Sequence, residues 1–324
     1  MKRWGMDAEG LSQAAEALQH GKLVGMPTET VYGLAGNALD SGSVAAIFEA
    51  KQRPTFDPLI VHVATLEEAW EITDAVPDLG KRLAEAFWPG PLTLVLPRKP
   101  GLPDLLSAGL DTIAVRVPSH PVARALIKKA GFPLAAPSAN RFGRISPTQA
   151  DHVISELSDS ALVAGVVDAG PCEKGVESTV IGFGEQGEVL VYRLGALPLE
   201  QIQDVVEELT VVTSPIESET HAEQAPGMLK SHYAPRTPLI LLEEGDPVPD
   251  VEGKTGWMRF DQKLEVPGPQ ELLSEQGDLS EAAGRLFASM RALDDLDLDQ
   301  LVAWKVPEQG LGRAINDRLN RAAQ

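Results

Sequence analysis

Cysteine is nearly missing from this sequence, since Cys172 is the single one among 324 residues. A lone cysteine excludes a disulfide within the chain and is typical of proteins kept in a reducing compartment. No histidine near Cys172 forms a pattern typical of thiol nucleophiles, so we interpret it as a small structural thiol.

Several signatures of membrane, metal and nucleotide binding are also missing. No apolar run is long enough to span a bilayer, and the first residues, MKRWGMDAEG, contain no apolar core of an export signal. The six histidines show no spacing typical of zinc ligands, and no P-loop motif is present. We therefore expect a soluble, cytoplasmic protein without a protein-bound metal, in which any ATP site uses residues other than a P-loop.

Positive charge is scarce. The chain has 28 Lys and Arg against 47 Asp and Glu, a net charge of −19, and most of this excess lies after residue 200. A tight hold on RNA phosphates needs clustered Lys and Arg, so composition argues against a nucleic-acid-binding surface. A local group of cations keeps an RNA-binding module open as an alternative function: Lys128, Lys129, Arg141 and Arg144.

Helices and strands alternate over the first 200 residues, which predicts an α/β or α+β domain with a mixed sheet. Apolar periodicity and capping residues predict helices at 8–20, 43–51, 65–72, 79–87 and 120–131. Short runs rich in β-branched residues predict strands at 22–26, 59–63, 92–96, 112–117, 164–170, 178–183 and 188–194. The length and the 43% hydrophobic content suggest a second core beyond this one.

The amino-acid composition changes near Thr210. The following stretch is rich in Ser, Pro, Glu and Thr and has the composition of a long loop, a linker or a lid. From Leu239 the strand LILL and the helical patterns at 280–293 and 312–323 predict a smaller α/β unit. We therefore expect a first domain over 1–209, a linker or lid over 210–238 and a C-terminal domain over 239–324.

One glycine pattern is misleading. Gly182, Gly184 and Gly187 spell the dinucleotide-binding motif G-x-G-x-x-G, but a strand follows them where that motif requires a helix. Glycines between two short strands are typical of a hairpin turn, and we predict one here.

Three segments concentrate polar side chains beside expected strands. PTETVYGL (27–34) follows a strand, where ligand loops of α/β sheets lie, although Thr and Gly also suit an ordinary turn. KQRPTFDPLIVH (51–62) carries Lys51 and Arg53 at a helix end and His62 in a strand. The alternative interpretation is that the two cations only complement the helix dipole and that His62, as a lone histidine, is a core residue. PSANRFGRISPT (137–148) precedes a helix that we expect to begin at Ser146 or Thr148, a plausible phosphate cradle or an ordinary capped helix.

These segments, together with GVESTV and YRLG, resemble the YrdC-like family in order and spacing over about residues 10–205. APGMLKSHYAPRTPL and the terminal GLGRAINDRLNRAA are similar to the long, two-domain form of that family. The resemblance implies a twisted open mixed sheet with helices and a large concave site, followed by a small Rossmann-like α/β domain. It also implies a nucleotidyltransferase that makes threonylcarbamoyl-AMP from L-threonine, bicarbonate or CO2 and ATP for tRNA threonylcarbamoyladenosine.

The resemblance also implies roles for particular residues. The positions matching the catalytic polar set are Lys51, Arg53, Ser138 and Asn140. Those matching the L-threonine site are Thr30, His62, Arg116 and Ser178, where a guanidinium suits the carboxylate. Those matching ATP contacts are Arg53, Asp57, Thr112, Ser138, Ser146, Arg193 and Tyr233, the last as a residue that closes over the nucleotide.

Asp57 departs from the family, which commonly has Asn there; an Asp removes an amide donor and adds negative charge near a triphosphate.

Mg²⁺ is expected to arrive on the phosphates of ATP. No general base is evident, so positioning and charge stabilisation are expected to drive the reaction, and the product is expected to pass to a tRNA-modifying transferase. A carbamoyl-transfer enzyme with another amine acceptor is a second alternative.

Overall fold

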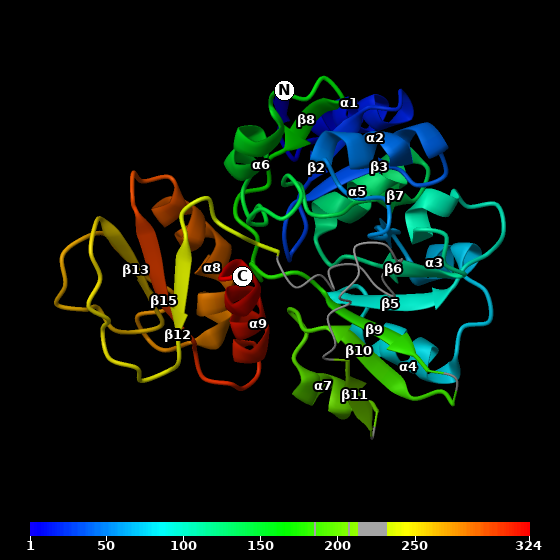
Figure 1. The fold of residues 1–324 in the computed structure, drawn as a ribbon. Helices are drawn as coiled ribbons and strands as arrows, with labels where there is room; N and C mark the ends of the chain where they lie inside the picture. Colours follow the sequence, from blue (N-terminus) through cyan, green and yellow to red (C-terminus); the bar gives the residue numbers. More distant parts are fainter. Residues whose placement is uncertain (185, 207, 213–231) are drawn as a thin grey trace.

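A computed structural model describes residues 1–184, 186–206, 208–212 and 232–324. Most of the expected linker, residues 213–231, therefore lies outside the described residues. The described elements form a larger and a smaller unit, each with its own sheet (Figure 1).

The larger unit contains an eleven-stranded mixed sheet in the order β1-β8-β2-β3-β7-β4-β6-β5-β9-β10-β11. Its strands are β1 (Lys2–Trp4), β2 (Leu23–Met26), β3 (Gly33–Asn37), β4 (Ile60–His62), β5 (Leu92–Pro97), β6 (Thr112–Arg116), β7 (Leu134–Ala135), β8 (Val163–Val167), β9 (Thr179–Phe183), β10 (Val189–Arg193) and β11 (Leu209–Val211). Its helices are α1 (Ala8–Gln19), α2 (Ser41–Lys51), α3 (Leu66–Ile72), α4 (Asp78–Phe87), the 3-10 helix η1 (Asp104–Ser107), α5 (Pro121–Ala130), α6 (Ala150–Leu157) and α7 (Leu199–Gln203).

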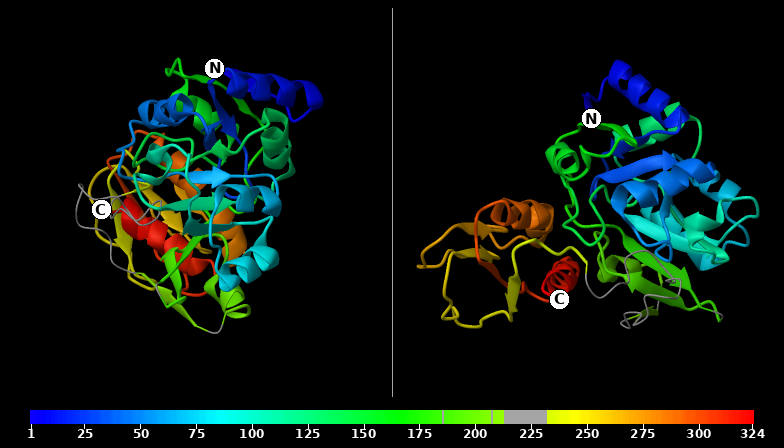
Figure 2. Two further views of the ribbon diagram at one scale, coloured as in Figure 1. Left: turned by 90° about the vertical axis from the view of Figure 1, so that its right-hand side faces the viewer. Right: turned by 45° about the horizontal axis from the view of Figure 1, so that its top comes forward.

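The smaller unit contains four parallel strands in the order β12-β15-β13-β14. Its elements are β12 (Leu239–Leu242), β13 (Thr255–Arg259), β14 (Gln270–Leu272), α8 (Leu279–Asp294), β15 (Gln300–Trp304) and α9 (Gly312–Ala322). In Figure 1 and in the right-hand view of Figure 2, α8 and α9 lie on the face of this small sheet that is turned toward the larger unit. The expected fold class, a mixed sheet with helices and a smaller Rossmann-like α/β unit, is confirmed.

Local signals explain most element boundaries. Asp7 caps α1 by accepting a hydrogen bond from the backbone N–H of Gly10, as its sequence position predicts. The predicted hairpin at the glycine pattern is confirmed, because β9 and β10 pair antiparallel and the N–H of Gly184 donates to the carbonyl of Glu188. These glycines therefore belong to a hairpin and not to the strand-to-helix turn of a dinucleotide-binding motif.

The prediction for the start of α6 is wrong, since the helix begins at Ala150 after Gln149. The hydroxyl of Ser146 donates to Glu177 at 2.6 Å instead of capping a helix, and the N–H of Thr148 donates to the ring of His152. The local sequence predicts that Ser146 caps the helix, but its hydroxyl instead binds Glu177, which lies far along the chain.

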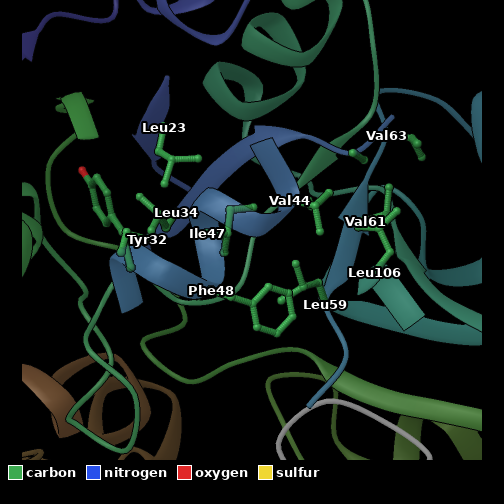
Figure 3. Packing of buried hydrophobic residues seen from close by; sticks show 14 of the residues in the cluster. Leu23, Tyr32, Leu34, Val44, Ile47, Phe48, Leu59, Val61, Val63 and Leu106 are labelled. Carbon is green, nitrogen blue, oxygen red and sulfur yellow. The ribbon is translucent and has the colours of Figure 1, made fainter. Parts of the chain in front are cut away.

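The core of the larger unit fixes the polar loops in place. Figure 3 shows Val44, Ile47 and Phe48 of α2 packed among side chains that include Leu34 and Leu59. Tyr32 belongs to the same buried cluster, and its phenol donates to the carbonyl of Gly170 at 2.8 Å. Its phenol thus anchors the PTETVYGL loop.

The two units share a hydrophobic core. One buried cluster joins Val31, Val176 and Tyr233 to Phe287 of α8 and Leu319 of α9. Because Val31 belongs to one of the polar loops, the helices of the smaller unit support the region where those loops meet.

Gly175 lies at a close backbone approach between the two units. Its φ is +68°, and a Cβ there would lie 2.3 Å from the carbonyl oxygen of Ala283 in α8. We expect Gly175→Ala to lower the free energy of unfolding by about 2 kcal/mol or more, through backbone strain and overpacking. Urea denaturation measures this loss. Gly170→Ala is the control, because Gly170 also has a positive φ but no atom within 4 Å of the added Cβ; equal losses in both variants would contradict tight packing at Gly175.

Candidate active site

A cavity opens at the edge of the large sheet where its central strands β4 and β6 end. Its walls come from the loop after β2, the ends of β4 and β6, the loop after β7, the entry to β9, the end of β10 and the residues before β12. The residues predicted for the site that line it are Thr30, Arg53, His62, Arg116, Ser138, Ser178, Arg193 and Tyr233.

The loop between β2 and β3 folds around one hydroxyl. Thr28 Oγ1 donates to the carbonyl of Val31 at 2.6 Å and accepts from the backbone N–H groups of Thr30 and Val31. Because that proton is committed, Thr30 donates in the 2.8 Å contact between the two hydroxyls. The turn therefore fixes the direction in which the Thr30 hydroxyl points.

Arg116, at the end of β6, is held on three sides. It donates to Glu29 Oε1 at 2.6 Å, to Thr30 Oγ1 at 2.9 Å and to the carbonyl of Gly90 at 3.1 Å. Burial raises the pKa of Glu29, but the charge and hydrogen bond of Arg116 outweigh it and the net pKa is lowered, so the pair is ionic near neutral pH. Each terminal nitrogen of a guanidinium carries two N–H groups. Arg116 therefore keeps N–H groups that can donate hydrogen bonds to the carboxylate of a ligand.

His62 pairs in register with Arg116 across the parallel strands β4 and β6. Burial, and then the charge of Arg116, lowers the pKa of His62 to about 3. The imidazole is therefore neutral at physiological pH and can accept a hydrogen bond inside the cavity.

Lys51 lies beneath the cavity and outside its lining. Its ammonium donates to the carbonyls of Ser138 and Asn140, and its own carbonyl accepts from the N–H of Phe142. Asn140 in turn donates to the carbonyls of Arg141 and Arg144. Lys51 and Asn140 thus shape the loop that presents Ser138, and neither is placed for direct contact with a ligand in the cavity.

Arg53 reaches the cavity from the residues after α2. Its guanidinium is held by the carbonyls of Asp57 and Pro58 at 3.1 and 2.9 Å and by the Asp57 carboxylate at 2.6 Å. Asp57 itself is fully buried and is not part of the cavity lining. The unusual Asp therefore faces the arginine.

Ser178 and Arg193 form the opposite wall. Arg193 donates to the carbonyl of Ser178 and to its hydroxyl at 3.1 Å, and Thr93 lies 2.8 Å from the same hydroxyl. Burial lowers the pKa of Arg193, but a guanidinium stays protonated near neutral pH. This wall offers one cation and one hydroxyl.

Glu177 and His232 also line the cavity, although neither was predicted to belong to the site. Burial raises the pKa of Glu177, but Arg318 and then Arg193 outweigh it, so the carboxylate stays ionised. Burial and the charges of Arg53 and Lys51 keep the pKa of His232 well below its usual value, so this ring is neutral. Glu177 stands inside the quoted GVESTV segment, but nothing in the sequence pairs it with Arg318.

Two further predicted ATP contacts lie off the cavity, as Asp57 does. Ser146 is buried behind it and contacts Glu177. Thr112 begins β6, four residues before Arg116, which places it about 13 Å away at a rise of about 3.3 Å per residue. The structure brings neither side chain into the lining.

Among the described residues, no group of three or more His, Cys, Asp or Glu could hold a metal ion. The carboxylates beside the cavity are committed to arginines, Glu29 to Arg116 and Glu177 to Arg318. Such a donor set fits a metal that arrives on a phosphorylated ligand better than a resident ion.

No helix in the described parts of the chain is long and apolar enough to cross a membrane.

Comparison with known proteins places this geometry in context. A family model described as Telomere recombination (Sua5, YciO and YrdC) matches residues 16–195, and one described as Threonylcarbamoyl-AMP synthase, C-terminal domain, matches residues 197–324. A threonylcarbamoyl-AMP synthase of Bacillus subtilis is 38% identical over 99% of this chain and 97% of its own length, and one of Pyrococcus abyssi is 40% identical over 96% and 93%. The crystal structure of P. abyssi Sua5 complexed with L-threonine superposes with a TM-score of 0.91 at 36% identity, covering 100% of this chain and 98% of that one. The chain therefore belongs to the Sua5/YciO/YrdC family, in the two-domain form that carries the threonylcarbamoyl-AMP synthase C-terminal domain.

Proposed function

We propose that this protein is a threonylcarbamoyl-AMP synthase, which condenses L-threonine, bicarbonate or CO2 and ATP to threonylcarbamoyl-AMP and pyrophosphate. The observation that carries this proposal is the convergence of Arg53, Arg116 and Arg193 with several hydroxyls in one cavity. Three buried cations suit a ligand set with a carboxylate and phosphates. The full-length relatives named for this activity, and the relative complexed with L-threonine, support it.

In the proposed reaction, L-threonine binds between Thr30, His62, Arg116 and Ser178. The threonine amino group, as the free base, captures CO2, losing a proton and forming a carbamate. A carbamate oxygen then attacks the α-phosphorus of ATP, the new P–O bond forms, and the bond to the β,γ-pyrophosphate breaks. The neutral ring of His62 can accept a hydrogen bond from threonine without adding a further positive charge.

Arg53, Ser138 and Arg193 are proposed to face the nucleotide, where preorganised cations and hydroxyls stabilise the charge that develops during α-phosphoryl attack. Lys51 and Asn140 act through the loop that they shape. Ser146 and Asp57 are proposed to act on ATP through Glu177 and Arg53, and a role for Thr112 stays a prediction from the resemblance. Mg²⁺ on the triphosphate oxygens would offset phosphate charge, which fits the commitment of the cavity carboxylates Glu29 and Glu177 to arginines.

Tyr233 is proposed to close over the nucleotide. Its ring is almost completely buried, lies at the cavity wall and stacks on Phe287 of α8. The resemblance gives Tyr233 this role, and the loop composition of the sequence before it is why we propose a lid role for residues 210–238. The proposed domain division into 1–209 and 239–324 follows from the change in composition near Thr210, and β11, which pairs with β10 as far as Val211, extends the first unit two residues into the expected linker. The product is proposed to pass to a tRNA-modifying transferase in the cytoplasm, without tight direct binding of nucleic acid.

Pyrophosphate release with different amino acids tests this function. We expect release to require both ATP and L-threonine, with little activity on L-serine or L-valine. The cavity would contact both the hydroxyl and the methyl group of the threonine side chain, and each of these analogues lacks one of them. Equal release with unrelated amines would favour the alternative of a carbamoyl-transfer enzyme with another acceptor. A tight tRNA complex that weakens steeply with salt, without ATP turnover, would favour the alternative of an RNA-binding module.

Asp57→Asn tests the position that departs from the family. The carbonyls of residues 57 and 58 still hold the Arg53 guanidinium in this variant, while one negative charge beside it disappears. We therefore expect the KM for ATP to fall by about 2- to 5-fold, with kcat little changed. Steady-state kinetics measure this, with Asp104→Asn, an exposed carboxylate paired with Arg98, as the control. A large rise in KM would mean that Asp57 itself contacts the nucleotide or its metal.

A further inference from the structure

Arg318 of α9 is a fully buried arginine from the smaller unit. Burying a guanidinium is expensive unless every donor finds a partner, so its contacts indicate what it does. Nε donates to Glu177 Oε2 at 2.8 Å and Nη2 donates to the carbonyl of Leu194 at 2.8 Å. The guanidinium also lies over the ring of Tyr233, 5.0 Å from its centroid, within the range of a cation–π contact.

A fourth contact, from Nη1 to the carboxylate of Asp317, stays within α9, whereas these three lead to the cavity. Glu177 and Tyr233 line it, and Leu194 directly follows Arg193, which also lines it. The second oxygen of Glu177 accepts the hydroxyl of Ser146 at 2.6 Å. One side chain of the smaller unit therefore touches Glu177 in the cavity wall, the backbone beside Arg193, and Tyr233 at the end of the expected linker.

The charge of Glu177 gives this contact a consequence for ATP. A buried carboxylate in the cavity wall repels a triphosphate unless a cation neutralises it, and Arg318 is the cation that binds it directly. Joining the two units does not require this arrangement. Arg313 of the same helix joins them through a more exposed ion pair with Glu200 at 2.6 Å.

We propose that Arg318 is a positioning residue of the ATP site, through which the C-terminal domain neutralises Glu177, orients it toward Ser146 and holds Tyr233 against the cavity. This inference rests on the proposed synthase function and deepens it. In this account the C-terminal domain completes the nucleotide-binding wall of the catalytic domain.

The test compares Arg318→Met, the double variant Glu177→Gln/Arg318→Met and the control Arg313→Met in the full-length protein. We expect Arg318→Met to raise the KM for ATP by about 10-fold or more, because truncating one partner of a buried charge pair leaves the other unpaired. The KM for L-threonine should change much less. The double variant should recover most of the affinity for ATP, since an amide still accepts the Ser146 hydroxyl and carries no charge.

The pH dependence provides a readout that simple loss of packing would not move. Without Arg318, the desolvation that raises the pKa of Glu177 is opposed only by Arg193 and the Ser146 hydroxyl, so we expect this pKa to lie above its wild-type value. Lowering the pH should then protonate Glu177 and relieve the repulsion. The KM for ATP of Arg318→Met, divided by that of the double variant, should therefore fall as the pH falls from about 8 to 6. The ratio isolates Glu177, because the other groups near it are common to both variants: Arg193, Tyr233, Asp317 and Arg321.

The outcomes separate the inference from the function on which it rests. If the wild type and Arg313→Met release no pyrophosphate, the proposed function fails. If both are active and Arg318→Met matches them in KM for ATP and in pH profile, the inference alone is overturned. If Arg318→Met does not fold, the double variant decides: near-normal KM for ATP supports charge neutralisation, and a KM as high as that of a nucleotide-site variant overturns it.

Discussion

Replacing Arg53 with alanine is expected to lower ATP- and threonine-dependent pyrophosphate release by about 100- to 1000-fold, the usual loss when one preorganised charge partner of a transition state is removed. Arg53 is the cation that the residues after α2 aim into the cavity, and three oxygens fix its orientation. Alanine removes the charge and leaves the Asp57 carboxylate without its arginine.

Two further variants sharpen this result. Arg53→Lys keeps a charge but loses the planar fork, so its activity should lie between those of the wild type and Arg53→Ala. Arg98→Ala, which breaks an ion pair with Asp104 outside the cavity, should leave activity unchanged. Pyrophosphate release that stays at the wild-type level in Arg53→Ala would refute the role of Arg53.

Replacing Arg116 with alanine is expected to have two separable effects. It leaves the carboxylate of Glu29 buried without its partner, which should cost about 3 to 5 kcal/mol of folding free energy. It also removes the proposed partner of the threonine carboxylate, so the KM for L-threonine should rise by about 100-fold. Denaturant unfolding and steady-state kinetics measure the two effects.

The double variant Glu29→Gln/Arg116→Ala distinguishes structure from binding. Neutralising Glu29 should return much of the lost stability, because no buried charge remains unpaired. Threonine binding should stay weak, because the guanidinium is still missing. If stability and the KM for L-threonine recover together, Arg116 is only a structural partner of Glu29.

The polar loops of the site were predictable because each is a contiguous segment beside a strong local signal. The predicted strands over 59–63 and 112–117 place His62 and Arg116 correctly, since β4 and β6 run parallel and end at the same edge. Strand β3 (Gly33–Asn37) was not predicted, because GLAGN has no β-branched residue. It forms because both neighbouring strands supply pairing partners.

Side-chain assignments within the loops were less predictable, because they depend on partners far along the chain. Lys51 has the sequence position of a phosphate ligand, yet two carbonyls some ninety residues away take its ammonium. Ser146 has the position of a helix cap, yet Glu177 accepts its hydroxyl. Arg318 stands in an ordinary amphipathic helix pattern, and only the packing of α9 against the larger unit reveals its contact with Glu177.

The central claim is that one cavity joins threonine to the α-phosphate of ATP. The most direct measurement is mass spectrometry of the products after the purified protein is incubated with ATP, L-threonine, bicarbonate and Mg²⁺. Threonylcarbamoyl-AMP and an equal amount of pyrophosphate should accumulate, and omission of L-threonine should abolish both. ATP cleavage to AMP and pyrophosphate that proceeds equally without threonine, or no adenylate in the complete mixture, would contradict the account.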